Sequence, residues 1–130
     1  MKLQNDFFRV KECCPTASGY DYTITLNAEH SIYQAHFPGN PITPGVCIIQ
    51  IIKELSESFL NRSLFLKKLN NVKFLNVLNP LDNNEVTFSI TIASEGDDGH
   101  KINAVVSNEN GTFAKLSLIF TFVERAHLKQ

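Results

Sequence analysis

The stretch that decides the fold is His36–Leu60, which reads HFPGNPITPGVCIIQIIKELSESFL. Its first part places one histidine in a loop with three prolines and two glycines. Proline fixes the backbone angle φ and removes a hydrogen-bond donor, while glycine lets a ligand approach the backbone closely. Such a loop forms neither helix nor strand readily, so we expect that it is kept for the geometry of a site.

A helix is predicted directly after this loop, from Val46 to about Leu60. Its apolar residues recur at helical spacing and polar residues occupy the other side; the apolar set is Ile48, Ile51, Ile52, Leu55 and Phe59. The first turn is apolar all round, which predicts burial of that end. We therefore expect a central helix that enters the core at its N-terminus and stops near Asn61.

Strand patterns lie on both sides of the helix. Apolar and polar residues alternate, as in half-buried strands, over 20–26, 86–92, 102–106 and 116–122, and a further strand is expected over 72–78. Short turns, among them Asn110-Gly111, join the later strands, and such turns give antiparallel pairing. The predicted fold class is α+β, with one or two strands, one helix and then three or four strands in a single domain, 1–130.

Composition argues against several classes of function. With 43% hydrophobic and 19% charged residues the chain is an ordinary globular protein, and a net charge of -1 without a large basic cluster argues against nucleic acid or an anionic membrane as partner. No apolar run is long enough to span a bilayer, and the first residues are too polar for an export signal, so we expect a cytoplasmic protein with reduced thiols. The histidines and cysteines show no metal-ligand spacing, so no metal is expected. His30, His100 and His127 are expected on the surface, and Cys47 in the core.

Residues 36–46 resemble the signature of the 3-hydroxyacyl-(acyl carrier protein) dehydratases of fatty-acid synthesis. That signature runs His-Phe-Pro-Gly-x-Pro-x-x-Pro-Gly into a helix, and the segment Val72–Pro80 is similar to the strand and turn that follow the helix in this family. The resemblance implies the hot-dog fold over residues 1–130, an antiparallel sheet wrapped around one long central helix. It also implies a dimer whose acyl tunnels lie at the interface and use residues from both subunits.

The resemblance assigns roles to the residues that match the signature. The reaction removes water from a 3-hydroxyacyl thioester to give the trans-2-enoyl thioester, and it needs a base, an acid and donors to the thioester carbonyl. His36 takes the place of the base, a role that suits imidazole at neutral pH. Backbone N–H groups near Gly45 suit the carbonyl, because the start of a helix carries unpaired donors. The residues expected to bind the substrate are Phe37, Gly39, Pro44, Gly45, Val46 and Ile48.

One position departs from the signature. Where the family has an acidic residue on the helix, this chain has Gln50, which we place in the catalytic site with His36. An amide orients a hydroxyl group or a water molecule but cannot donate a proton at neutral pH. Three compensations stay open: Glu54, which lies one turn further along the same face; a water molecule held by Gln50; or a proton returned by His36 itself.

Three functions follow from these observations. The leading one is a dehydratase that acts on acyl carrier protein or coenzyme A thioesters in fatty-acid, lipid or polyketide synthesis, as a homodimer or an assembly of dimers and without a cofactor. The second is a catalytically impaired homologue that binds acyl carrier protein or pairs with an active relative as a heterodimer. The third is a hot-dog acyl thioesterase. This function is disfavoured because those enzymes usually need a carboxylate to activate water, and Gln50 does not provide one.

Overall fold

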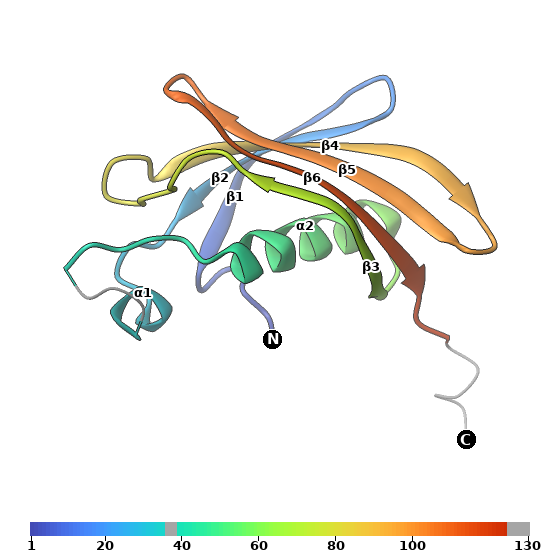
Figure 1. The fold of residues 1–130 in the computed structure, drawn as a ribbon, viewed down its shortest axis with the longest axis horizontal. Helices are drawn as coiled ribbons and strands as arrows, with labels where there is room; N and C mark the ends of the chain where they lie inside the picture. Colours follow the sequence, from blue (N-terminus) through green and yellow to red (C-terminus); the bar gives the residue numbers. More distant parts are fainter. Residues whose placement is uncertain (36–38, 125–130) are drawn as a thin grey trace.

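The computed structural model describes residues 1–35 and 39–124, which form a curved sheet around one long helix (Figure 1). The helices and strands follow one another along the chain in this order: β1 (Phe8–Pro15), β2 (Gly19–Leu26), α1 (Ser31–Ala35), α2 (Gly45–Leu60), β3 (Leu64–Phe74), β4 (Glu85–Gly96), β5 (Gly99–Asn108) and β6 (Gly111–Phe122). The prediction of an α+β fold with one long helix is confirmed.

The sheet has six strands in the order β1-β2-β4-β5-β6-β3, and every neighbouring pair is antiparallel. Two tight turns join β4, β5 and β6, and each is followed by a glycine with positive φ, Gly99 at 133° and Gly111 at 137°. Residues with side chains rarely adopt such angles, so these glycines let the chain reverse within a few residues. α2 carries the chain from β2 on one side of the sheet to β3 at the opposite edge.

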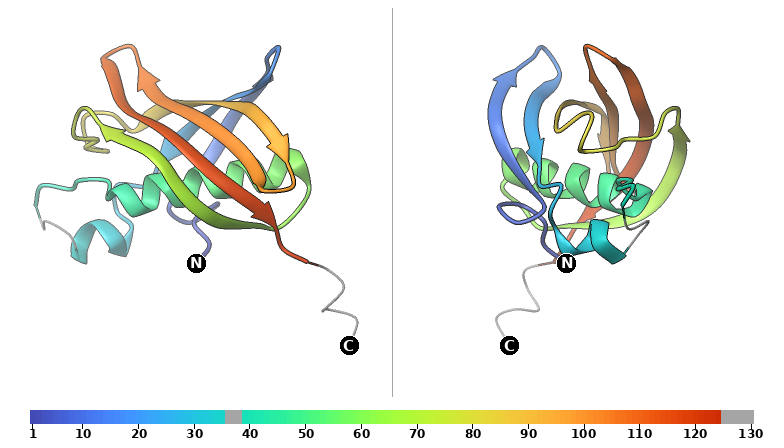
Figure 2. Two further views of the ribbon diagram at one scale, coloured as in Figure 1. Left: turned by 45° about the vertical axis from the view of Figure 1, so that its right-hand side comes forward. Right: turned by 90° about the vertical axis from the view of Figure 1, so that its left-hand side faces the viewer.

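The core lies between α2 and the concave face of the sheet, which curls around the helix (Figure 2). The helix buries Ile48, Ile51, Ile52 and Leu55, which share one side at helical spacing. Alternate residues of the strands meet them from the sheet, such as the fully buried Phe88. α2 ends at Leu60 because Asn61 adopts the left-handed conformation with φ 53°, as predicted.

β3 lies elsewhere than the sequence pattern suggested. The predicted strand 72–78 is wrong at both ends, because β3 runs from Leu64 to Phe74 and residues 75–78 form a connection. Its register on β6 shifts between Leu66 and Lys68 and again between Leu69 and Asn71, so polar and apolar residues do not alternate along it. Pairing with β6, rather than local alternation, therefore sets this strand.

Candidate functional site

The loop before α2 is fixed to its surroundings through Thr43. Its backbone N–H donates to the carbonyl oxygen of Leu78 at 2.8 Å, and its hydroxyl shares a 2.9 Å hydrogen bond with that of Tyr33. Both side chains are buried, and burial raises the pKa of Tyr33 far above its ordinary value, so the phenol stays protonated. The loop therefore reaches α2 in one position, fastened to α1 on one side and to the segment after β3 on the other.

Two of the expected site residues, His36 and Phe37, lie outside the described residues. The chain on either side of them is described. α1 ends at Ala35, and Gly39 resumes the chain in a turn with a positive φ of 82°. Their roles as base and as substrate contact therefore stay predictions.

The first turn of α2 presents backbone donors. Pro44 precedes the helix and makes no side-chain capping bond, while its carbonyl oxygen accepts from Cys47 and Ile48 at 3.0 and 3.2 Å. The N–H groups of Gly45 and Val46 come before the first of these bonds, so they have no partner within the helix. They lie at the positive end of the helix dipole, where an oxygen with partial negative charge is stabilised.

A hollow of about 250 Å³ adjoins this turn. Mostly apolar residues of the loop, the helix and the chain after β3 line it: Ile42, Thr43, Gly45, Ile48, Phe74, Leu75, Asn76, Val77 and Leu78. The Phe74 ring lies so close to Gly45 that a β-carbon there would be 2.6 Å from Cζ of the ring. Glycine is therefore needed for this contact, and the hollow combines apolar walls with the backbone N–H of Gly45, which has no partner within the helix.

A second hollow, of about 260 Å³, lies on another face of α2. It is lined by Val46, Ile49, Gln50, Lys53, Leu64, Phe65, Leu66 and Phe120. The expected site residues therefore lie in two different hollows. Gly45 and Ile48 line the first, because they are three positions apart on one face of α2. Val46 and Gln50 line the second, because they are four positions apart on another face. Within one copy of the chain, the structure does not bring Gln50 into the hollow beside Gly45.

Gln50 is already bound to other groups of the protein. Its side-chain Nε2 donates to the carbonyl oxygen of Met1 at 2.7 Å and to Oε2 of Glu54 at 2.9 Å. Glu54 is 5% exposed, and its two oxygens also accept from the backbone N–H groups of Leu3 and Gln4, at 2.7 and 2.8 Å. The carboxylate of Glu54 therefore holds residues 1–4 against the helix. Sequence periodicity gave no sign of this contact.

Two histidines that were expected on the surface are in fact largely covered. The side chain of His30 is 11% exposed and binds Asp6 at 2.9 Å, and that of His100 is 17% exposed and packs on Phe122. The prediction failed because each imidazole packs on an aromatic ring, Phe7 in the case of His30. His127 lies outside the described residues. Cys47 is buried as expected, and burial raises the pKa of its thiol.

Comparison with known proteins identifies the family. A sequence model described as the ApeI-like dehydratases matches residues 12–114. The chain belongs to the ApeI-like dehydratase family. Over the ranges 1–35 and 39–124, no helix of this ApeI-like protein is long and apolar enough to cross a bilayer.

Several curated relatives carry the name 3-hydroxyacyl-[acyl-carrier-protein] dehydratase FabZ. The relative from Wolbachia pipientis is 31% identical over 119 residues, which cover 85% of this ApeI-like chain and 82% of that protein. Those from Pediococcus pentosaceus and Lactiplantibacillus plantarum are 36% and 34% identical, and the chain spans only 43% and 54% of their length.

Solved structures show the same fold. The dehydratase heterocomplex ApeI:P from Xenorhabdus doucetiae is 18% identical with a TM-score of 0.67, covering 85% of this chain and 95% of that one. The thioesterase-like protein yhdA from Lactococcus lactis is 11% identical with a TM-score of 0.65, covering 92% and 94%. The ApeI-like chain therefore has the hot-dog fold, as the signature implied.

Proposed function

We propose that this protein is a dehydratase that converts 3-hydroxyacyl thioesters into trans-2-enoyl thioesters. In this reaction a base takes the proton from C2, the C2–C3 double bond forms, and the C3 hydroxyl leaves as water. The observation that carries the proposal is the start of α2, where Gly45, whose N–H group has no partner within the helix, lines an apolar hollow in a chain of a dehydratase family.

The hollow beside Gly45 suits the acyl thioester. Its carbonyl oxygen gains negative charge as C2 loses a proton, and the helix N–H groups stabilise that charge. The acyl chain then lies against Ile48, Phe74 and Leu78, which are apolar residues of the same hollow. His36 is the base of this proposal.

Gln50 acts on the leaving hydroxyl group as an acceptor. Its Nε2 is used by Met1 and Glu54, so the side-chain oxygen Oε1 is the atom left to orient the hydroxyl or a water molecule. Glu54 does not replace the missing acid, because both of its oxygens hold N–H donors. Protonated His36 therefore returns the C2 proton to the departing hydroxyl.

We infer that two copies of the chain complete each site. β3 is an edge strand, and Phe65 and Leu69 on it are 63% and 52% exposed, while Val46 at the start of α2 is 65% exposed. Unpaired edges with exposed apolar residues favour pairing with another strand. Pairing of two β3 edges in a homodimer would let the Gln50 hollow of one copy face the Gly45 hollow of the other.

A second candidate keeps the fold without turnover. The amide at position 50 and its bonds to Met1 and Glu54 favour a protein that binds acyl thioesters or completes the site of an active relative. The Xenorhabdus doucetiae neighbour is described as a dehydratase heterocomplex. In this case the protein would bind acyl carrier protein and show no activity alone.

Mass spectrometry of a 3-hydroxyacyl-(acyl carrier protein) incubated with the purified protein separates these functions. Formation of the enoyl species by the wild type, and its loss in His36→Ala, would support the dehydratase. A Gln34→Ala variant, changed on the exposed side of α1, serves as the control. Binding without turnover across several chain lengths would favour the hetero-pairing protein, and release of free thiol would establish a thioesterase. The same reaction with a coenzyme A thioester identifies the carrier.

A further inference from the structure

The outer face of the sheet, turned away from α2, carries a basic patch. Three adjacent strands, β3, β5 and β6, contain five lysines and no aspartate or glutamate. The acidic residues of the sheet lie in β1, β2 and β4 instead. The chain as a whole is nearly neutral, with a net charge of -1, so the patch reflects how the charges are distributed.

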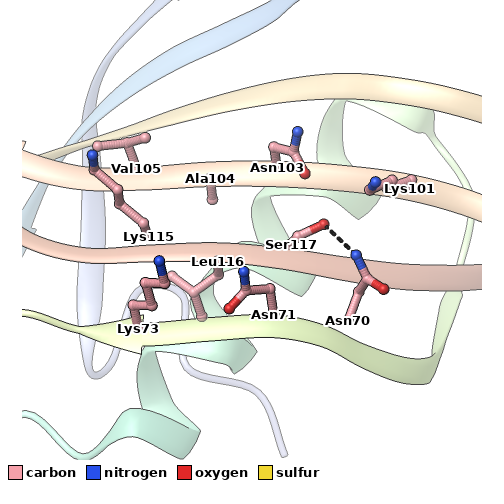
Figure 3. A pocket seen from close by; sticks show the side chains of 10 residues that line it. All are labelled: Asn70, Asn71, Lys73, Lys101, Asn103, Ala104, Val105, Lys115, Leu116 and Ser117. Carbon is pink, nitrogen blue, oxygen red and sulfur yellow. Dashed lines mark hydrogen bonds between the residues drawn. The ribbon is translucent and has the colours of Figure 1, made fainter.

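A hollow of about 390 Å³ lies at the centre of this patch (Figure 3). Lysines and neutral amides from the three strands surround it, and the polar ones are Asn70, Asn71, Lys73, Lys101, Asn103, Lys115 and Ser117. Asn70 donates to the hydroxyl oxygen of Ser117 at 3.3 Å, which is the bond drawn in Figure 3. Within residues 1–35 and 39–124, none of its three lysines forms an ion pair.

The register of the strands brings two of these lysines directly opposite each other. Lys73 on β3 pairs with Lys115 on β6. Side chains in such positions are about 5 Å apart at their β-carbons, and like charges there destabilise a sheet. In the next cross-strand row Asn103, Ser117 and Asn71 lie side by side. The fold itself does not require the lysine pair, so its charge is available for a partner.

Beside these lysines, Asn103 carries a hydrogen-bond acceptor that has no partner among the described residues. This acceptor is the side-chain Oδ1, which is buried. A buried polar atom without a partner is unfavourable. Because Asn103 lines the hollow, rotation of its side chain would bring Oδ1 to a ligand that donates an N–H or O–H group. The occupant must therefore bring negative charge together with a hydrogen-bond donor.

The spread of the lysines indicates a partner with several separate charges. Lys101 lies four residues along β5 from Val105, which pairs with Lys115, so the two lysines are about 13 Å apart along the sheet. A single phosphate group does not span that distance. A second copy of the chain that docks through the same face does not fit either, because it would bring the same positive charges.

We propose that this outer face binds an acidic segment of a partner protein, whose carboxylates pair with Lys73, Lys101 and Lys115 and whose backbone N–H satisfies Asn103. The face is separate from both hollows on α2 and does not depend on the proposed dehydratase activity. Pairing of β3 edges would extend the sheet in its own plane and leave this face open.

Fluorescence anisotropy with labelled poly-L-glutamate tests the proposal on the full chain. We expect the wild type to bind the probe with an affinity that falls as salt rises. The double variant Lys73→Gln/Lys115→Gln should weaken binding about tenfold. The control Lys2→Gln/Lys11→Gln makes the same change in charge away from the patch and should bind like the wild type. The side-chain amide signal of Asn103 should shift in NMR spectra as the probe binds.

Two further measurements complete the test. Relief of the lysine pair should raise the melting temperature of the double variant by about 1–4 °C, which also shows that it folds. Equal loss of binding in both double variants, or an unmoved Asn103 signal, would overturn the proposal. Binding of inorganic pyrophosphate that depends on Lys73 and Lys115, without binding of poly-L-glutamate, would replace the acidic partner with a phosphate ligand.

Discussion

Replacing Gln50 with glutamate is the change that probes this site most directly. The amide Nε2 lies 2.9 Å from Oε2 of Glu54 and 2.7 Å from the carbonyl oxygen of Met1, and Gln50→Glu places an acceptor where a donor stood. Two ionised carboxylate oxygens 2.9 Å apart, one on position 50 and one on Glu54, would repel each other by about 6 kcal/mol at an effective dielectric constant of about 20. A proton shared between the carboxyl groups avoids this repulsion, so the pKa of the pair should lie above the ordinary glutamate value.

The sign of the resulting pH dependence follows from this shift. The folded variant binds the shared proton more tightly than the unfolded chain, so its stability relative to the wild type falls as pH rises from about 4 through the raised pKa. Gln50 is partly exposed, so movement of the new carboxylate away from Glu54 relieves most of this repulsion. At pH 8 the lost donor bonds and the remaining repulsion should lower the free energy of unfolding by about 2–4 kcal/mol. At pH 5 we expect a much smaller difference.

Urea unfolding at pH 5 and at pH 8 measures this effect. Gln34→Glu is the matched control, because it makes the same change in charge on an exposed residue of α1. The double variant Gln50→Glu/Glu54→Gln restores an amide beside a carboxyl group and should recover part of the stability. If Gln50→Glu were as stable as the wild type at pH 8, the contacts of Gln50 would not hold as described.

The same variant should affect turnover. A protonated carboxyl group at position 50 supplies the acid that glutamine lacks, and general acids contribute about 10²–10⁴ in rate. We expect enoyl formation by Gln50→Glu to exceed that of the wild type, most clearly at low pH where the shared proton is bound. A variant that folds and binds the substrate yet is no faster would show that protonation of the hydroxyl does not limit the rate.

Three further changes test other parts of the site. Gly45→Val drives a side chain into the Phe74 ring, which a β-carbon alone would approach to 2.6 Å, and should lower kcat/KM at least tenfold while the protein stays folded in a thermal melt. Thr43→Val leaves the buried Tyr33 hydroxyl unpaired and should lower the free energy of unfolding by about 1–3 kcal/mol, whereas Thr43→Ser should not. Leu69→Lys puts a charge on the exposed edge of β3 and should shift a dimer to monomers in light scattering; an unchanged mass would refute pairing through that edge.

Much of the fold was predictable because it depends on local pattern. The helical spacing from Ile48 to Phe59 and the alternation over 86–92 are short-range signals, and both elements formed where they were expected. β3 was not predictable in this way. Its bulges and its place beside β6 depend on residues about fifty positions further along the chain, and its own polar residues give no alternation to read.

The candidate site likewise has features that follow from neighbouring residues and others that depend on contacts between distant ones. By itself the sequence determined the loop, the glycine that opens α2 and the glutamine at position 50, since these are properties of neighbouring residues. Only the tertiary structure decided that the carbonyl of Met1 binds Gln50, that the carboxylate of Glu54 binds the backbone of Leu3, and that Lys73 lies opposite Lys115. Contacts between distant residues depend on strand register and on how the chain packs as a whole, and local periodicity carries no record of either.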